Sequence, residues 1–162
     1  MNRNLLMIVL ALGAAGLSAC GFTPLYAEQG VTGGLSRIAI EAPDGRTAYL
    51  LREELDDVLG HARDAPAAYR LAFDLVESRV PRGLGPDNAA SRYELSVQVD
   101  WRLLAAAGEE LQSGQTTVLV TYGAADAPYA GVAAQQDGQE RAAAEAARRI
   151  RLDLAQFFAR QG

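Results

Sequence analysis

Cys20 is the residue whose chemistry stands out in this sequence, because it is the only cysteine and it ends the segment Leu-Ser-Ala-Cys at 17–20. Before it come one positive charge at Arg3, an apolar run over 5–17 and two small residues. A basic start, an apolar stretch of about 7–15 residues and a small-residue cleavage site are typical of a removable signal peptide. The run is also shorter than the roughly 20 apolar residues of a transmembrane helix. We therefore expect residues 1–19 to be a leader that is removed.

The same four residues resemble a bacterial lipobox, in which the cysteine thiol is acylated and becomes the first residue of the mature chain. Stable anchoring takes more than one acyl chain, so we expect several chains, palmitate among them, on Cys20. Gly21 stands where an Asp commonly retains lipoproteins in the inner membrane, which favours the outer membrane and its periplasmic side. The alternative is an ordinary leader with a chance cysteine. With no second cysteine, no intramolecular disulfide can form.

The charge of the chain argues against nucleic acid as a partner. The sequence has 15 basic residues, all arginine, and 20 acidic ones. Without Arg3 the mature part carries 14 minus 20, a net charge of −6. An acidic protein has no diffuse basic field to attract a polyanion, so contact with an anionic lipid would need a local group of arginines.

The layout of the chain predicts a short tether and one domain. Residues 20–34 contain Pro24 and the glycines Gly30, Gly33 and Gly34 and are expected to form a tether from the membrane. The length of 35–162 suits a single domain. Asp44 is expected to cap the first helix and Gly60 to end it. Hydrophobic periodicity predicts strands at 35–40, 69–75, 92–103 and 111–122 and helices at 46–59 and 135–159.

The segment 92–103 shows the clearest alternation of apolar and polar residues. Such a period of two indicates a strand with one buried face, which places Trp101 in the core. The order β-α-β-β-β-α then predicts an α+β fold, a two-layer sandwich in which two helices cover one face of a mostly antiparallel sheet.

Residues for catalysis or metal binding are not apparent. His61, the only histidine, follows a helix-ending glycine and is expected at the surface. No Ser lies in a G-x-S-x-G motif, and no His/Cys cluster has metal-ligand spacing. The glycine-rich segment 83–86 lacks a following Lys-Ser or Lys-Thr and is read as a hairpin loop, not a phosphate cradle. We expect a protein that is not an enzyme and has no cofactor beyond its acyl chains.

The start Cys-Gly-Phe-Thr-Pro-Leu-Tyr at 20–26, the Thr121-Tyr122 strand end and the Ala/Arg-rich terminal helix together resemble the LPS-assembly lipoprotein family LptE, in its alphaproteobacterial form. The resemblance implies an outer-membrane lipoprotein that plugs the β-barrel LptD, supports folding of that barrel and assists insertion of lipopolysaccharide into the outer leaflet. Two other hypotheses stay open: an auxiliary lipoprotein of an ABC-type lipid transport system, and a structural lipoprotein with no transport role.

Three arginines are candidate contacts for lipopolysaccharide. Arg79, Arg82 and Arg92 flank or occupy the longest strand connection, predicted at 80–90. Guanidinium groups bind phosphates such as those of lipid A through paired hydrogen bonds. The alternative is that they only solubilise a hairpin. The outward face of 92–103 is polar, as a plug in a polar barrel lumen requires.

Overall fold

The computed structural model describes residues 29–62, 66–84, 90–124 and 127–161. Predicted features at Cys20, the leader 1–19 and the segment 20–28 lie outside this part of the chain. The elements in chain order are α2 (Gln29–Leu35), β1 (Ile38–Glu41), α3 (Arg46–Leu59), β2 (Tyr69–Leu84), β3 (Ala90–Ala105), β4 (Glu110–Gly123) and α4 (Pro128–Ala159).

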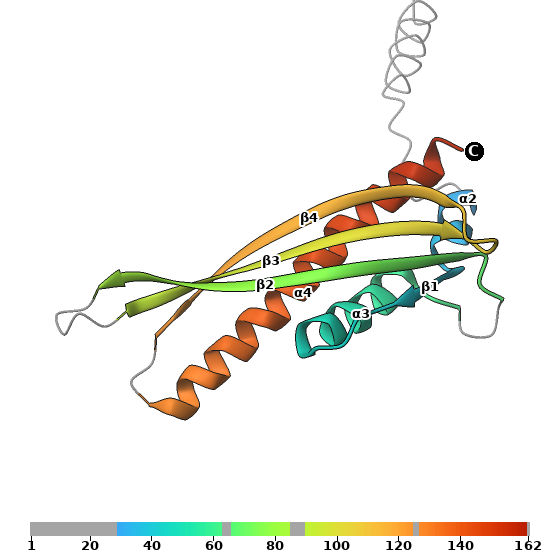
Figure 1. Cartoon of the computed structure of the whole chain (residues 1–162). Coiled ribbons are helices and arrows are strands. Elements are labelled where there is room, and N and C mark those ends of the chain that lie inside the picture. The colour runs from blue at the N-terminus through green and yellow to red at the C-terminus, as the bar shows by residue number, and fades with distance from the viewer. Residues whose placement is uncertain (1–28, 63–65, 85–89, 125–126, 162) are drawn as a thin grey trace, which may run out of the picture.

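The strands form one sheet in the order β1-β2-β3-β4. β1 pairs with β2 in parallel, because α3 connects them and returns the chain to the same end of the sheet. β2, β3 and β4 form an antiparallel meander. Figure 1 shows α3 and α4 on the same side of this sheet. The predicted two-layer α+β sandwich is confirmed.

The core lies between the sheet and α4. Trp101 is 2% exposed, as its alternation predicts, and packs over Gly114 of β4, where a side chain would collide with the indole ring. α4 meets the sheet through alanines, whose small side chains let the helix approach closely. The fully buried residues of this helix include Ala142, Ala143, Ala146, Ala147, Ile150 and Leu154. None of the described helices is long and apolar enough to cross a membrane.

α3 matches its predicted range, but its first turn is built differently. Leu51, Leu55 and Leu59 are buried, and Gly60 ends the helix with a positive φ of 64°. The predicted cap at Asp44 is wrong. Gly45 holds the N-cap position, and no side chain bonds to the helix start.

The N-terminal part of the domain corrects the predicted tether and first strand. Residues 29–35 form α2, and the strand begins only at Ile38. Val31 and Leu35, one helical turn apart, are buried against the core. Gly34 makes the packing possible, because a Cβ there would lie 2.8 Å from the Cδ1 of Phe158 in α4.

The connection after β2 and the connection before α4 are both shorter than predicted. In each case a proline that was expected to lie in a loop belongs to the neighbouring element. β2 continues through Pro81 to Leu84. β1 pairs only as far as Ala72, so beyond that point β2 is an edge strand among the described residues, and an edge tolerates proline. α4 begins at Pro128, a favourable first helical residue because its missing N–H would have no helical partner.

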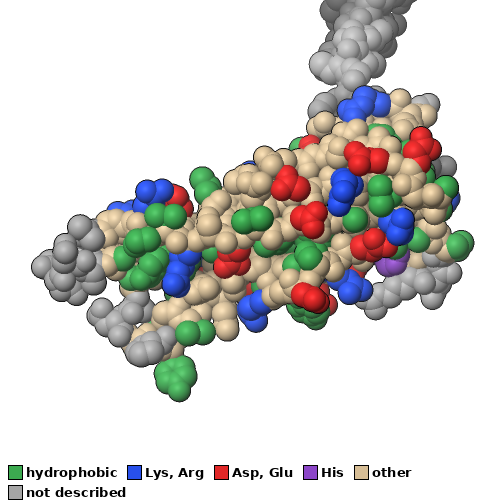
Figure 2. Space-filling model, viewed as in Figure 1, with side chains coloured by type: hydrophobic (Ala, Val, Ile, Leu, Met, Phe, Trp, Pro, Cys, Tyr) green, Lys and Arg blue, Asp and Glu red, His purple; other side chains and the backbone are tan. Residues whose placement is uncertain are grey.

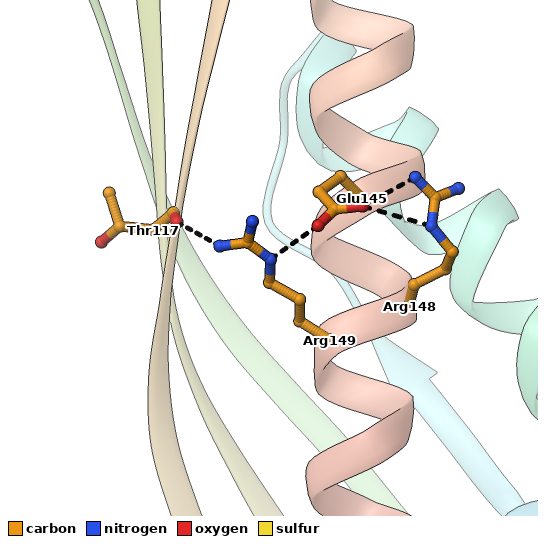
Figure 3. Close-up of polar contacts among 4 residues, drawn as sticks. All are labelled: Thr117, Glu145, Arg148 and Arg149. Carbon is orange, nitrogen blue, oxygen red and sulfur yellow. Dashed lines mark hydrogen bonds and ion pairs between the residues drawn. The ribbon is translucent and has the colours of Figure 1, made fainter.

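Arg149 joins α4 to the outer edge of the sheet (Figure 3). Its Nη1 donates to the Thr117 carbonyl of β4 at 3.0 Å, and its Nε donates to Glu145 at 2.8 Å. Glu145 also accepts two hydrogen bonds from Arg148. Hydrogen bonds from Arg148 and then Arg149 hold the pKa of Glu145 below its ordinary value.

Arg149→Ala is therefore expected to lower the melting temperature by roughly 1–3 °C, and Arg148→Ala by less. Both variants lose a bond to Glu145, but only the first loses the contact with β4. A carboxyl group with a lowered pKa stabilises the fold above its unfolded pKa, and that contribution disappears as pH falls through its folded pKa. Thermal melts at neutral and acidic pH should show Arg148→Ala converging with wild type in acid, whereas Arg149→Ala should keep the part of its loss that comes from the bond to the Thr117 carbonyl. Equal losses for the two variants would contradict the role of the β4 contact.

Candidate functional site

The three candidate arginines lie toward the end of the sheet opposite α2 and the C-terminus (Figure 1). They do not form one cluster. Side chains alternate between faces along a strand, so Arg79 points toward the helices while Arg82 points to the other face. Arg82 pairs across the ladder with Arg92, and both lie on the face that no described helix covers.

Arg79 lines a small pocket between the sheet and the start of α4, which we call the Arg79 pocket. Its volume is about 240 Å³, and its lining includes Arg79, Tyr93, Tyr122, Gly131, Val132 and Gln135. The guanidinium carbon lies 4.7 Å from the centroid of the Tyr93 ring, a cation–π contact. Its Nη1 donates to the Gln135 Oε1 at 2.8 Å. The arginine thus links β2, β3 and α4.

The Tyr122 hydroxyl raises the pKa of the Arg79 guanidinium above its ordinary value by stabilising the cation. The hydroxyl is buried, yet it makes no hydrogen bond of ordinary geometry with any described residue. Arg79 therefore stays charged at every physiological pH.

Arg82 and Arg92 differ in how their charge is balanced. The Arg82 Nη2 lies 2.7 Å from the Glu94 Oε1, in an ion pair whose side chains are 53% and 30% exposed. Arg92 forms no ion pair with any residue that the structure describes. Of the two, Arg92 has the guanidinium that is freer to meet an external anion.

A polar cluster that the sequence analysis missed joins α3, β2 and α4. The Glu77 Oε2 accepts from the Thr47 hydroxyl at 2.5 Å, and both Glu77 oxygens accept from the Gln139 Nε2 at 3.0 and 3.1 Å. Thr47 and Gln139 are buried, with 4% and 8% exposed. The available signal was the position of Glu77, which follows Leu71, Phe73 and Leu75 on the apolar face of its strand.

The lone histidine and the acidic residues do not form a metal-binding group in the part of the chain that the structure describes. His61 is half-buried just beyond the C-terminal end of α3, where its backbone N–H donates to the Asp56 carbonyl. In the described ranges, no three His, Cys, Asp or Glu side chains could hold a metal ion together. The end of the sheet that carries the three arginines, which we call the tip, offers guanidinium groups, and Arg79 among them lies over the Tyr93 ring. Guanidinium groups are suited to anionic oxygen.

Comparison with known proteins places the chain in a family. The model of the family described as LptE, Lipopolysaccharide-assembly, matches residues 35–154. A Caulobacter crescentus protein described as a lipoprotein is similar in structure, with a TM-score of 0.72, 53% identity, and coverage of 80% of this chain and 96% of that one. No curated protein sequence matches the chain.

More distant structures share the fold. Rare lipoprotein B from Shewanella oneidensis aligns with a TM-score of 0.56 and 18% identity over 74% of this chain and 93% of its own. A minor lipoprotein from Acinetobacter baumannii aligns with a TM-score of 0.58 and 16% identity over 75% and 92%. The family match spans most of the domain, including α3, the whole sheet and α4 as far as residue 154. This chain belongs to the lipopolysaccharide-assembly family LptE.

Proposed function

We propose that this protein is an outer-membrane lipoprotein that plugs the β-barrel LptD, supports assembly of that barrel and assists insertion of lipopolysaccharide into the outer leaflet. The observation that carries the proposal is the family match over residues 35–154. The domain agrees with it, since one end of its sheet carries the three arginines. The role is one of assembly and binding, not catalysis.

Anchoring is the part of the proposal that depends on Cys20. We infer that the leader 1–19 is removed and that acyl chains on this cysteine hold the protein at the periplasmic side of the outer membrane. The domain is then attached to the membrane through the end that carries α2, because α2 is the first described element after Cys20. Lipoproteins among the structural neighbours support this inference.

Affinity purification of the tagged, acylated protein from detergent-solubilised outer membranes tests the proposal. We expect a large β-barrel to be recovered in a roughly equimolar complex. A Cys20→Ala variant should leave the outer-membrane fraction, because it cannot be acylated. Recovery of inner-membrane transporter subunits would instead favour an auxiliary lipoprotein of an ABC-type lipid transport system. Recovery of no partner would favour a structural lipoprotein.

We further propose that Arg79, Arg82 and Arg92 contact lipopolysaccharide phosphates, although from two faces of the sheet. Arg92 lacks an internal partner among the described residues, and Arg79 keeps donors beyond the one that Gln135 accepts. The net negative charge of the chain gives no general attraction for the lipid, so local guanidinium groups must supply it.

Replacing all three arginines by alanine should reduce capture of lipopolysaccharide by about tenfold or more, since charge-assisted bonds to phosphate are lost. Stability should change little, because exposed substitutions usually stay within about 0.5 kcal/mol each. The matched control is Arg52→Ala, Arg141→Ala and Arg148→Ala, which removes the same charge from helix positions that are 50–61% exposed. Equal capture of lipopolysaccharide by wild type and by the variant without the three arginines would refute a specific contact. A loss of capture that the control variant shares would refute it as well.

A further inference from the structure

One face of the sheet is left uncovered by the described helices. It consists of the even-numbered residues of β2 and β3, from 74 to 82 and from 92 to 104, and the odd-numbered residues of β4 from 113 to 123. We call this surface the open sheet face. The residues that alternate with these along each strand point to the opposite face and are buried under α3 and α4, as the burial of Val97, Val99 and Val118 shows. The open sheet face is therefore fixed in shape by the core behind it.

The charges of the open sheet face are mostly neutralised within it. The Arg102 Nη2 lies 3.5 Å from the Asp74 Oδ2, in addition to the pair between Arg82 and Glu94 at 2.7 Å. Asp100 accepts hydrogen bonds from Gln115 at 2.6 Å and Gln98 at 3.1 Å, and these bonds lower its pKa. Figure 2 shows acidic and basic side chains interspersed over the surface in view.

This pairing matters because removing water from a lone charge is costly, whereas a paired or hydrogen-bonded charge loses less. Between the charged pairs the face is uncharged, with Ser96 in the centre and three exposed aliphatic side chains nearby. These are Val76, Val80 and Leu119, which are 61%, 42% and 63% exposed. Together the features describe a surface that can be buried against a polar wall.

The helix layer presents the opposite pattern. α3 carries a run of acidic residues over 53–57, and among the described residues only Asp56 forms an ion pair there, with Arg52 at 3.9 Å. Burying that surface would leave several carboxylates without a counter-charge. It is therefore suited to remain in water.

We propose that the open sheet face, except for its end at Arg82 and Arg92, is the surface that contacts the inner wall of the partner barrel, with the acidic side of α3 facing the water-filled part of the lumen. This inference rests on the proposed function, because it takes the partner to be a β-barrel with a polar interior. The self-paired charges and the uncharged centre of the face match such a wall. The acidic side of α3 does not.

An arginine placed on each surface tests the assignment in the full, acylated protein. Leu119→Arg puts an unpaired charge on the open sheet face, and Tyr49→Arg adds the same charge to α3, one turn before Glu53, at a similar exposure of 57%. We expect Leu119→Arg to lower the amount of co-purified barrel by about tenfold or more. Tyr49→Arg should recover as much as wild type. Thermal melts check that both variants fold.

A second measurement does not depend on destabilising the complex. A photoreactive amino acid at position 96 should crosslink to the barrel, and one at position 54 should not. If wild type recovers no barrel, the proposed function itself fails. If wild type recovers it and Leu119→Arg does too, or the crosslink forms from position 54 alone, only the assignment of the face is overturned.

Discussion

Trp101→Ala is expected to reduce the free energy of unfolding by about 3–5 kcal/mol, the usual cost of removing a large aromatic side chain from a core. The indole is 2% exposed, pairs across the ladder with Phe73 and fills the space over Gly114. No neighbouring side chain can move into that volume without leaving its own contacts, so a cavity remains. Urea denaturation of the mature domain measures the loss.

The glycine opposite provides the control for this prediction. A Cβ at position 114 would lie 2.5 Å from the Trp101 Cζ2, so Gly114→Ala should destabilise wild type by about 1–3 kcal/mol through overpacking. The same alanine should change the free energy of unfolding little or not at all in the Trp101→Ala background, because the indole ring with which it collides is absent there. Additive losses, or a loss below about 1 kcal/mol for Trp101→Ala, would show that the two residues do not pack as described.

Glu77→Ala is expected to lower the free energy of unfolding by about 2–3 kcal/mol. It leaves the buried Thr47 hydroxyl and the Gln139 amide without their acceptor, and an unpaired buried donor retains its full desolvation cost. Glu77→Gln keeps an acceptor oxygen and should recover part of the loss. The comparison variant is Glu109→Ala, at an exposed position in the turn between β3 and β4.

Denaturation curves and amide hydrogen exchange separate these outcomes. The cluster ties the first turn of α3 to β2 and α4, so exchange should increase first at the start of α3. If Glu77→Ala were no less stable than Glu109→Ala, the cluster would not contribute to the stability of the fold.

The parts of the fold that periodicity specifies were predicted well from the sequence. β3 was recognised because its apolar and polar residues alternate without a break, and α3 because its leucines recur at helical spacing. The errors lie at glycines and prolines, because each of these residue types is compatible with more than one local structure. Glycines in 29–35 favour a loop, yet Val31 and Leu35 gain enough burial to form α2. Pro81 and Pro128 favour a break, yet one lies on an edge strand and the other begins a helix.

The candidate site shows a different limit of sequence reasoning. Arg79, Arg82 and Arg92 are close in sequence, but which face each occupies depends on whether β2 continues past Val80. Treating that segment as a loop concealed that Arg79 and Arg82, three residues apart, must point to opposite sides. The Thr47–Glu77–Gln139 cluster was beyond reach, because its members come from three elements that only the tertiary packing brings together.

The packing of α2 against the last turns of α4 has a practical consequence for handling the protein. Gly34 lies against Phe158, so the point where the chain enters the domain and its C-terminus share one end of the molecule (Figure 1). A purification tag fused after Gly162 would therefore sit beside the end through which the proposed acyl anchor holds the domain, and would compete for space with detergent or lipid. A tag inserted in a loop at the opposite end of the molecule is not a suitable substitute, because that end carries the arginines whose binding to lipopolysaccharide is to be measured. A C-terminal tag on a long, uncharged linker leaves both the arginine-bearing tip and the sheet accessible.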